Sequence, residues 1–440
     1  MNQLLKIKQK VKAETSGMIC EVDQFLGDGG QGEVYRAVMN GKPIALKWYY
    51  TASATRDQRL ALGTIIKKGP PSDEFLWPME LVSDLGVHNF GYIMPLRPQS
   101  YKGIHDLMRR RVEPTFKVLA TAGLNLVDGY HRLHSFGWCY CDISFGNVFL
   151  DPNTGEVLIC DNDNVTVDGN LKGAVSGTPR FMAPEIVLGK ALPSTQTDLF
   201  SLAVLLFYFF VMHHPFNGKR EAAIHSFDPA AMRKLYGEKP VFIFDPDDDS
   251  NRPVPGYQDN ANAFWPIYPN FFRRLFIRVF TEGVRDPSHG RVRESEWRIA
   301  MVSLRDSIIY CPICGMENFY DSEALKSTGS GCPLCWSCKK KFNLPPRIRL
   351  GGRIVMLNHD TELYPHHLHD PNSFDFSRPV AAVTKHPADP RFLGLRNLSG
   401  QKWVANSSGG KIKDIEPGQS ITLAMGTKIH FGKVEGEIRV

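Results

Sequence analysis

Apolar and polar residues alternate near the start of the chain and follow a helical spacing farther on. Residues 18–26, 33–39 and 43–50 are β-prone runs, separated by the glycine-rich stretch 27–32 and by Asn40-Gly41. Asn-Gly between two β-prone runs is typical of a two-residue hairpin turn. We therefore expect three strands here. A helix over residues 54–68, ended by Gly69, and a strand near residues 91–96 should follow.

From about Phe116 the apolar spacing becomes helical and remains so to about residue 305, with a polar, proline-bounded loop at Asp245–Pro255. This pattern predicts a β-rich first lobe followed by an α-rich second lobe. The most apolar run, Leu199–Met212, is shorter than the roughly 20 residues that a helix needs to cross a bilayer. We expect it to form a buried core helix.

Beyond Leu344-Pro345-Pro346, short β-prone runs alternate with Gly, Asn, Asp and Pro turns, which predicts an all-β module. A chain of 440 residues is long enough for about two to four domains. The expected class is α+β. The expected division is an N-terminal segment (1–18), a bilobal domain (19–305, with lobes 19–96 and 97–305), a cysteine-rich segment (306–345) and a β-sandwich-like domain (346–440).

Composition excludes few functions. Apolar residues make up 42% and charged residues 22%, which are ordinary globular values. The net charge of +6 is scattered and Lys339–Lys341 is only a short basic cluster, so no nucleic-acid surface is expected. The N-terminal stretch lacks the features of a signal peptide, and we expect a cytoplasmic protein without a membrane segment.

The first motif with chemical meaning is the stretch Gly27–Gly32. Such a stretch occurs in dinucleotide folds and in ordinary turns, but here it leads into a strand and not into a helix. A glycine hairpin of this kind can place its backbone amides over phosphates. Lys47 lies in the next apolar strand, where an anionic nucleotide would compensate its charge.

The second motif combines Asp142, Asn147 and Asp161 on two loops that flank a hairpin. Two carboxylates and an amide provide the oxygen ligands that Mg²⁺ needs when it bridges ATP phosphates.

In this order, the motifs resemble those of the protein-kinase family over about residues 20–300. Residues 26–35 are similar to its glycine loop, residues 45–47 to the strand with the ATP-binding lysine, and residues 141–147 to its catalytic loop. Residues 177–185 resemble the end of a Ser/Thr-kinase activation segment.

Later positions extend this resemblance. Thr197-Asp198 is similar to the start of the buried central helix of the kinase second lobe, and Arg291 is the expected ion-pair partner of Glu185.

The resemblance implies an ATP- and Mg²⁺-dependent serine/threonine kinase of bacterial style that phosphorylates a partner protein and itself. Asp142 would orient or accept the proton of the attacking hydroxyl, Asn147 and Asp161 would hold magnesium, and Lys47 would hold the α- and β-phosphates. Met94 would be the gatekeeper of the hinge. The implied nucleotide-binding residues are Leu26, Gly27, Asp28, Gly29, Gly30, Gln31, Gly32, Val34, Ala45, Lys47, Met94 and Leu96.

Several positions depart from the family pattern. Tyr140-Cys141 stands where His-Arg is usual, so control by an activation-loop phosphate is not expected. Ser144 replaces the lysine typical of Ser/Thr kinases, so the substrate class depends mainly on Thr178.

Asp161-Asn162-Asp163 stands where Asp-Phe-Gly is usual. No glutamate lies between residues 51 and 68 to pair with Lys47, and Gln58 is the nearest substitute. The alternative is a nucleotide-binding pseudokinase scaffold that recruits partners through its later domains.

Five of the nine cysteines lie between Cys311 and Cys338. Two Cys-x-x-Cys turns can bring four thiolates into a tetrahedron, which is a strong indication of zinc. We favour Cys311, Cys314, Cys335 and Cys338 as ligands, because residues 335–339 resemble the second knuckle of a zinc ribbon. Cys332 is the alternative ligand. Four ligands would close the site, which indicates a structural or partner-binding role.

The last module weakly resembles a forkhead-associated domain, a class that binds phosphothreonine through Arg, Ser and His side chains. Arg353, His366 and His367 are the upstream candidates, although a β-sandwich used for packing or docking is the simpler interpretation. We expect His131 and His134 to be structural. The resemblance also suggests a phosphatase and a von Willebrand-type protein as partners.

Overall fold

The computed structural model describes residues 3–84, 89–168, 177–329, 331–369, 374–386 and 388–439. The chain divides into two compact units. The first comprises residues 1–114, 121–265 and 274–298, and the second comprises residues 115–120, 266–273 and 299–440. Both helices and strands contribute to the described chain, as an α+β protein requires.

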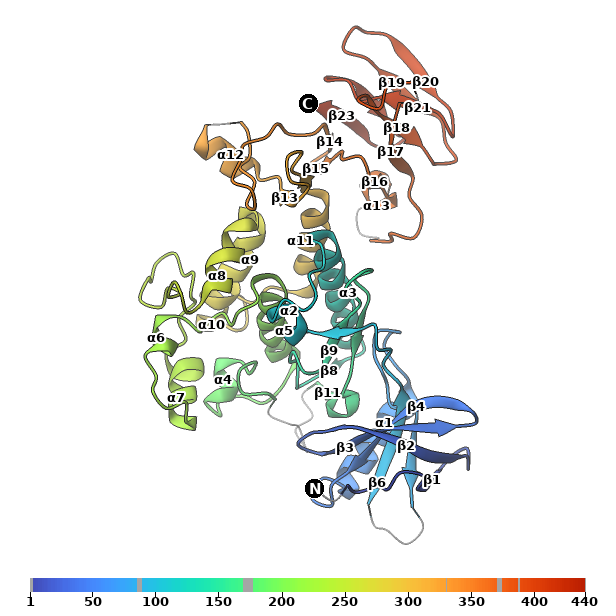
Figure 1. Cartoon of the computed structure of the whole chain (residues 1–440), viewed down its shortest axis with the longest axis vertical. Helices are drawn as coiled ribbons and strands as arrows, with labels where there is room; N and C mark the ends of the chain where they lie inside the picture. Colours follow the sequence, from blue (N-terminus) through green and yellow to red (C-terminus); the bar gives the residue numbers. More distant parts are fainter. Residues whose placement is uncertain are drawn as a thin grey trace. The chain divides into compact units, whose positions relative to one another are not determined.

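The first unit begins with antiparallel strands that close into a barrel in the order β1-β2-β3-β4-β6-β5 (Figure 1, blue). These strands are β1 (Lys10–Ala13), β2 (Ile19–Asp28), β3 (Gly32–Met39), β4 (Lys42–Tyr49), β5 (Glu80–Ser83) and β6 (Phe90–Pro95). Helix α1 (Arg56–Lys68) follows β4, with its N-terminus capped by the side chain of Thr55. The strands and the helix expected in this region are therefore present.

The turn between β3 and β4 is the predicted Asn-Gly hairpin. Asn40 and Gly41 have φ angles of 50° and 72°, the left-handed conformation that these two residue types tolerate best. The register that the turn sets places Val34 opposite Lys47.

The segment 1–18, which we expected to lie outside the bilobal domain, instead contributes strand β1. This strand pairs with both β2 and β5, and it buries Val11 and Ala13 in the barrel core. The sequence signal is weak because the strand has only four residues, two of which are exposed lysines. Tertiary pairing therefore decides the conformation of this segment.

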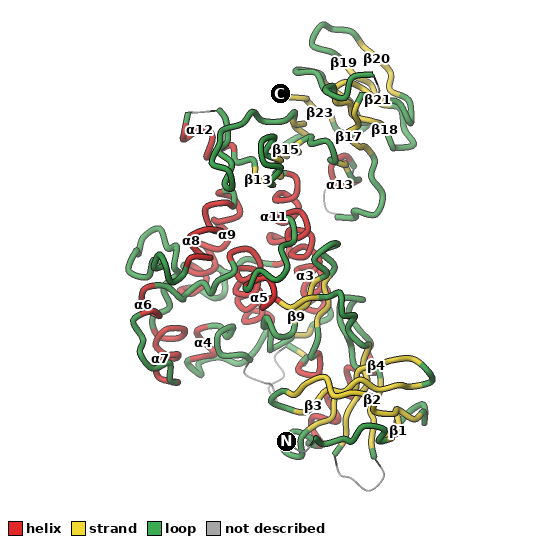
Figure 2. The backbone as a smooth tube through the Cα atoms, viewed as in Figure 1, coloured by secondary structure: helices red, strands yellow, loops and turns green. Residues whose placement is uncertain are grey.

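The rest of the first unit is mainly helical (Figure 2). Its helices, some of which have residues assigned to the second unit, are α2 (Ile104–Met108), α3 (Phe116–Ser135), α4 (Pro184–Val187), α5 (Thr195–Val211), α6 (Lys219–Ala222), α7 (Pro229–Arg233), α8 (Asp259–Phe264), α9 (Asn270–Phe280), α10 (Glu282–Arg285) and α11 (Glu294–Asp306). Short strands accompany them, namely β7 (Lys102–Gly103), β8 (Trp138–Cys139), β9 (Val148–Leu150), β10 (Val157–Ile159) and β11 (Thr166–Val167).

Helix α5 confirms the core helix that the apolar run predicts. Every residue from Thr197 to Val211 is buried, and Ser194 caps the helix through a capping box with Thr197. Among the helices of the described residues, none combines the length and the apolar character that a membrane span requires.

The second unit contains β12 (Ile308–Tyr310), β13 (Glu317–Phe319) and α12 (Ser322–Thr328), followed by two antiparallel sheets. One sheet has the order β15-β14-β23-β22-β19-β20 and the other the order β16-β17-β18-β21. Their bounds are β14 (Arg347–Leu350), β15 (Arg353–Met356), β16 (Glu362–Leu363), β17 (Ala381–Lys385), β18 (Leu393–Asn397), β19 (Trp403–Asn406), β20 (Ile412–Ile415), β21 (Ser420–Thr422), β22 (Lys428–His430) and β23 (Glu435–Arg439). Both sheets contribute to one apolar core.

The histidines considered for phosphothreonine binding are buried. His366 and His367 lie in the short helix α13 (Pro365–Leu368) with 2% and 5% exposure. Nε2 of His367 lies 3.1 Å from Asp306, and its Nδ1 accepts the backbone N–H of Tyr364 at 2.8 Å. These two candidate rings are therefore part of the interior of the second unit, and the structure does not expose them to a phosphopeptide.

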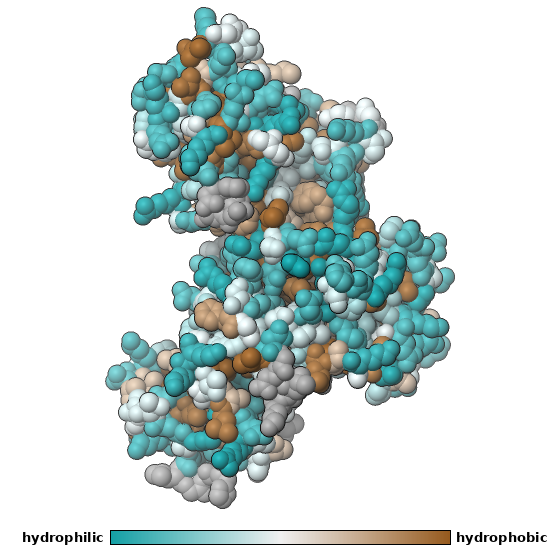
Figure 3. All heavy atoms as spheres, turned by 180° about the vertical axis from the view of Figure 1, so that it is seen from behind, coloured by the Kyte–Doolittle hydropathy of each residue, from teal (hydrophilic) through white to brown (hydrophobic). Residues whose placement is uncertain are grey.

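On the face shown in Figure 3, apolar residues form small groups among polar ones. This surface is typical of a folded protein, in which exposed apolar side chains are common and carry no function by themselves.

Candidate active site and cysteine cluster

The glycines at the turn from β2 to β3 and in the adjoining strand ends have two different roles. A Cβ atom on Gly32 would lie 2.2 Å from the carbonyl oxygen of Trp48, so only glycine fits beside strand β4. A Cβ on Gly27, Gly29 or Gly30 would meet nothing within 4 Å. The turn therefore leaves open space next to its backbone, where a ligand can approach closely.

Strand β4 buries Lys47, whose side chain is 6% exposed. Its Nζ contacts Oδ1 of Asp161 and lies 3.0 and 2.8 Å from the carboxylate oxygens of Asp163. Burial lowers the pKa of Lys47, but the charges of Asp163 and Asp161 outweigh this effect and raise the pKa above its ordinary value. Lys47 therefore remains a cation inside the first unit.

The loop after β8 presents Asp142. Its Oδ1 accepts the hydroxyl of Thr178 at 2.7 Å, and the amide of Asn147 donates to its backbone carbonyl at 3.0 Å. Burial raises the pKa of Asp142, and the hydrogen bonds from Thr178 and Asn147 offset part of this rise. The amide of Asn147 also donates to Oδ2 of Asp142 at 3.4 Å, so two neutral donors orient the carboxylate.

Asp198 of helix α5 holds the backbone of this loop. Its carboxylate accepts the N–H groups of Tyr140 at 2.5 Å and Cys141 at 3.1 Å. Cys141 has a φ of 70°, a conformation that costs energy for a residue with a side chain. The charged hydrogen bonds to Asp198 compensate this strain and place Asp142 at the end of the turn.

We expected Gln58 to be the nearest substitute for a glutamate that pairs with Lys47, but in the structure Asp163 takes this place. The amide of Gln58 donates to the hydroxyl of Tyr49 and to the backbone carbonyl of Asp163, both at 3.2 Å. Asp163 itself contacts Lys47, because the turn Asn162–Asn164 directs its carboxylate inward. Sequence reasoning missed this residue because the position is normally glycine in the resembled motif.

The predicted nucleotide-binding and catalytic residues all line one cleft of about 560 Å³, a typical size for a small-molecule site. They are Leu26, Gly27, Asp28, Gly29, Gly30, Gln31, Gly32, Val34, Ala45, Lys47, Met94, Leu96, Asp142, Asn147 and Asp161. These residues come from separate parts of the sequence. The fold of the first unit brings them together.

The cleft also contains residues that sequence reasoning did not single out, among them Leu76, Arg97, Phe149 and Cys160. The guanidinium carbon of Arg97 lies 4.0 Å from the ring centre of Phe149. Phe149 lies in strand β9, two residues after Asn147. Because side chains alternate between the two faces of an extended segment, Phe149 could have been expected on the same face as Asn147.

His134 is structural, as expected. Its ring lies between two carboxylates, contacting Glu294 through Nδ1 and lying 3.2 Å from Asp198 through Nε2. Burial lowers the pKa of His134, but hydrogen bonds and charge attraction from Asp198 and Glu294 raise it to about 10. The expected ion pair between Arg291 and Glu185 is also present, at 2.5 Å.

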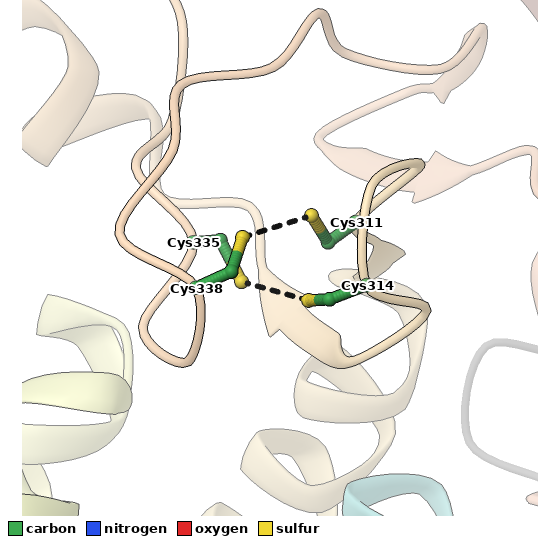
Figure 4. Close-up of side chains that lie close together, drawn as sticks. All are labelled: Cys311, Cys314, Cys335 and Cys338. Atoms are coloured by element: carbon green, nitrogen blue, oxygen red, sulfur yellow. Dashed lines mark hydrogen bonds between the residues drawn. The ribbon is translucent and has the colours of Figure 1, made fainter.

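In the second unit, the sulfur atoms of Cys311, Cys314, Cys335 and Cys338 lie within 4.8 Å of one another (Figure 4). The Sγ atoms of Cys311 and Cys338 are 3.7 Å apart, and those of Cys314 and Cys335 are 3.6 Å apart. A tetrahedral site with Zn–S bonds of about 2.3 Å needs sulfur separations of about 3.8 Å. The four thiols therefore fit a zinc ion, and they are the set that the sequence favours.

The surroundings of Cys335 also favour a thiolate. Burial opposes the charge, but N–H donors from Cys338, Asn318 and Ser337, with a contribution from Cys314, lower the pKa of Cys335 to about 6. Cys332 takes no part in the cluster, and its sulfur lies 3.7 Å from the amide oxygen of Asn343.

Comparison with known proteins connects the first unit to a domain family. Residues 87–253 match the model of the protein kinase domain. This range includes Asp142, Asn147 and Asp161, whereas the glycine turn and Lys47 precede it.

Several curated proteins are similar to part of the chain. The probable serine/threonine-protein kinase CCRP1 of Zea mays is 29% identical over 228 residues, which cover 49% of this chain and 36% of that protein. The serine/threonine-protein kinase PknK of Mycobacterium tuberculosis is 28% identical over 195 residues, covering 41% of this chain and 17% of PknK. The dual specificity protein kinase shkB of Dictyostelium discoideum is 23% identical over 264 residues, which cover 56% of this chain and 37% of that protein.

This chain thus covers little more than a third of each relative's length, or less. Residues 87–253 of the first unit are thus protein kinase-like by this match, and the names of the relatives support the serine/threonine class.

Proposed function

We propose that the protein transfers the γ-phosphoryl group of ATP, in the presence of Mg²⁺, to serine or threonine hydroxyls of a partner protein and of itself. The observation that carries the proposal is the convergence of Lys47, Asp142, Asn147 and Asp161 on one cleft beneath an open glycine turn. A structural protein has no need for a buried lysine and three polar side chains in that arrangement. Phosphoryl transfer uses this set for positioning and charge neutralisation.

In this mechanism, the glycine turn provides room for the phosphates and Lys47 donates to their oxygens. The carboxylate of Asp142, oriented by hydrogen bonds from Thr178 and Asn147, accepts the proton of the acceptor hydroxyl. Magnesium, when bound, would neutralise phosphate charge. Asn147 and Asp161 fit this ion because both offer oxygen atoms from the wall of the cleft.

The test is transfer of labelled γ-phosphate by the purified chain to itself and to a generic acceptor protein, with and without Mg²⁺. Asp142→Asn and Lys47→Ala should abolish incorporation while leaving the far-UV circular dichroism unchanged. Binding of ATP without any incorporation by the unmodified chain would contradict the proposal and would favour the scaffold alternative.

For the second unit we propose a structural zinc site formed by the four clustered cysteines. The fit of their sulfur separations to a tetrahedron supports it. Four protein ligands leave no open position for a substrate, so the ion would stabilise the fold of residues 308–342 and would not take part in phosphoryl transfer.

A further inference from the structure

Lys47 has two carboxylate partners, and they differ in exposure. The side chain of Asp161 is 34% exposed, whereas that of Asp163 is fully buried. Asp161 lines the 560 Å³ cleft. Asp163 instead lines a smaller cavity of about 220 Å³ beside helix α1, which shares Gln31 and Asn164 with the lining of the cleft.

Because they differ in exposure, Asp161 and Asp163 can have different roles beside Lys47. An ion or phosphate in the main cleft can reach Asp161, and the proposed magnesium would take up its charge. Of the two carboxylates, the fully buried Asp163 would then remain to pair with Lys47. A buried ammonium group without a counter-ion is very unfavourable, so Lys47 needs the charge of Asp163 whenever Asp161 binds metal and no phosphate contacts Lys47.

The position of Asp163 is fixed by neutral hydrogen bonds from several elements. The hydroxyl of Tyr49 donates to its carboxylate, and the amide of Gln58 donates to its backbone carbonyl at 3.2 Å. The neighbouring Asn162 donates to the carbonyl oxygens of Leu76 and Ile159, both at 2.9 Å. The loop is therefore held to both the β-rich and the helical parts of the first unit.

We propose that Asp163 is a positioning residue that serves as the permanent counter-ion of Lys47, in place of a carboxylate on helix α1. This inference rests on the proposed kinase function. Helix α1 then contributes only neutral hydrogen bonds through Gln58. The charge that pairs with Lys47 therefore does not come from α1, and this helix affects the ion pair only through the hydrogen bonds of Gln58.

The decisive experiment is steady-state kinetics of Asp163→Asn, which keeps the size of the side chain and removes its charge. We expect kcat/KM for ATP to fall roughly tenfold to a hundredfold. The half-activating Mg²⁺ concentration should remain that of the unmodified chain. Asp161→Asn should raise this concentration. Asp23→Asn is the matched control, because Asp23 is an exposed carboxylate of strand β2 that pairs with Arg36.

A second-site substitution distinguishes positioning from a merely structural role. Gln58 lies 3.2 Å from the Tyr49 hydroxyl that contacts Asp163. Gln58→Glu should therefore restore part of kcat/KM when combined with Asp163→Asn. Gln58→Ala alone should cost less than Asp163→Asn, because it removes only neutral hydrogen bonds.

ATP binding measured by calorimetry separates failure of this inference from failure of the proposed function. If the unmodified chain binds ATP without transferring phosphate, the kinase proposal fails. The inference would still be supported if Asp163→Asn binds ATP more weakly than the unmodified chain and the double variant Lys47→Ala/Asp163→Asn binds no more weakly than Lys47→Ala alone. Unchanged kinetics and binding in Asp163→Asn would overturn it. A higher Mg²⁺ requirement in Asp163→Asn would also overturn it, since Asp163 would then be a metal ligand.

Discussion

The hydroxyl of Thr178 donates a hydrogen bond of 2.7 Å to Oδ1 of Asp142 across a gap of 36 residues in the sequence. Gly177 makes this approach possible. It has a φ of 95°, and a Cβ atom there would lie 2.9 Å from the carbonyl oxygen of Cys141. The segment that resembles the end of an activation segment is thus tied directly to the proposed catalytic carboxylate.

Removing the Thr178 hydroxyl should impair the proposed phosphoryl transfer. We expect Thr178→Val to lower kcat roughly tenfold or more, because the carboxylate of Asp142 loses the donor that orients it. Thr178→Ser keeps the hydroxyl and should retain most of the activity. Comparison of kcat for the two variants checks this prediction, and equal kcat values for both variants would count against it.

His134 should make stability depend on pH. Its folded-state pKa of about 10 lies above the ordinary 6.5, so its contribution is fully present below about pH 6.5 and is lost as the pH rises through about 10. His134→Gln should lower the free energy of unfolding by about 3 kcal/mol at pH 7, because Asp198 and Glu294 lose their shared cation.

Urea unfolding from pH 6 to pH 10 measures this effect. The difference in stability between the unmodified chain and His134→Gln should shrink as the pH increases. His131→Gln, on the same helix, is the control. A constant difference across this pH range would show that His134 is neutral in the folded protein.

The ion pair between Arg291 and Glu185 should be a major stabilising contact. The Arg291 side chain is 1% exposed and also donates to the carbonyl oxygen of Gln196 at 2.6 Å. Glu185→Gln should destabilise the first unit by about 3 kcal/mol, since it leaves a buried guanidinium without its anion. Thermal unfolding tests this value. Arg233→Gln, which removes an exposed ion pair with Glu238, should cost less than about 1 kcal/mol.

The cysteine cluster should bind one zinc ion per chain. Metal analysis of the purified protein should give this stoichiometry, and Cys335→Ser should abolish it. Cys332→Ser should retain the zinc, because this sulfur lies outside the cluster. A chelator should lower the unfolding temperature of the unmodified protein and of Cys332→Ser alike. Loss of zinc from Cys332→Ser would show that the ligand set is wrong.

Local sequence signals were sufficient to predict a structural element where the residues of one short segment determine its conformation. The Asn40-Gly41 turn follows from backbone preference, and helix α5 follows from an apolar run that is too short for a membrane. The Cys-x-x-Cys spacing likewise indicated a metal cluster, because each cysteine pair lies in one local turn.

The sequence by itself thus predicted the β-rich first part, the central helix, the glycine turn and those cleft residues that belong to recognisable local motifs. Tertiary structure decided which groups meet: β1 completes the barrel, His366 and His367 are buried, and Asp163 replaces Gln58 as the partner of Lys47. These outcomes depend on contacts between segments far apart in the chain. Burial makes an uncompensated charge costly, so the folded interior, and not local preference, selects the carboxylate that pairs with Lys47.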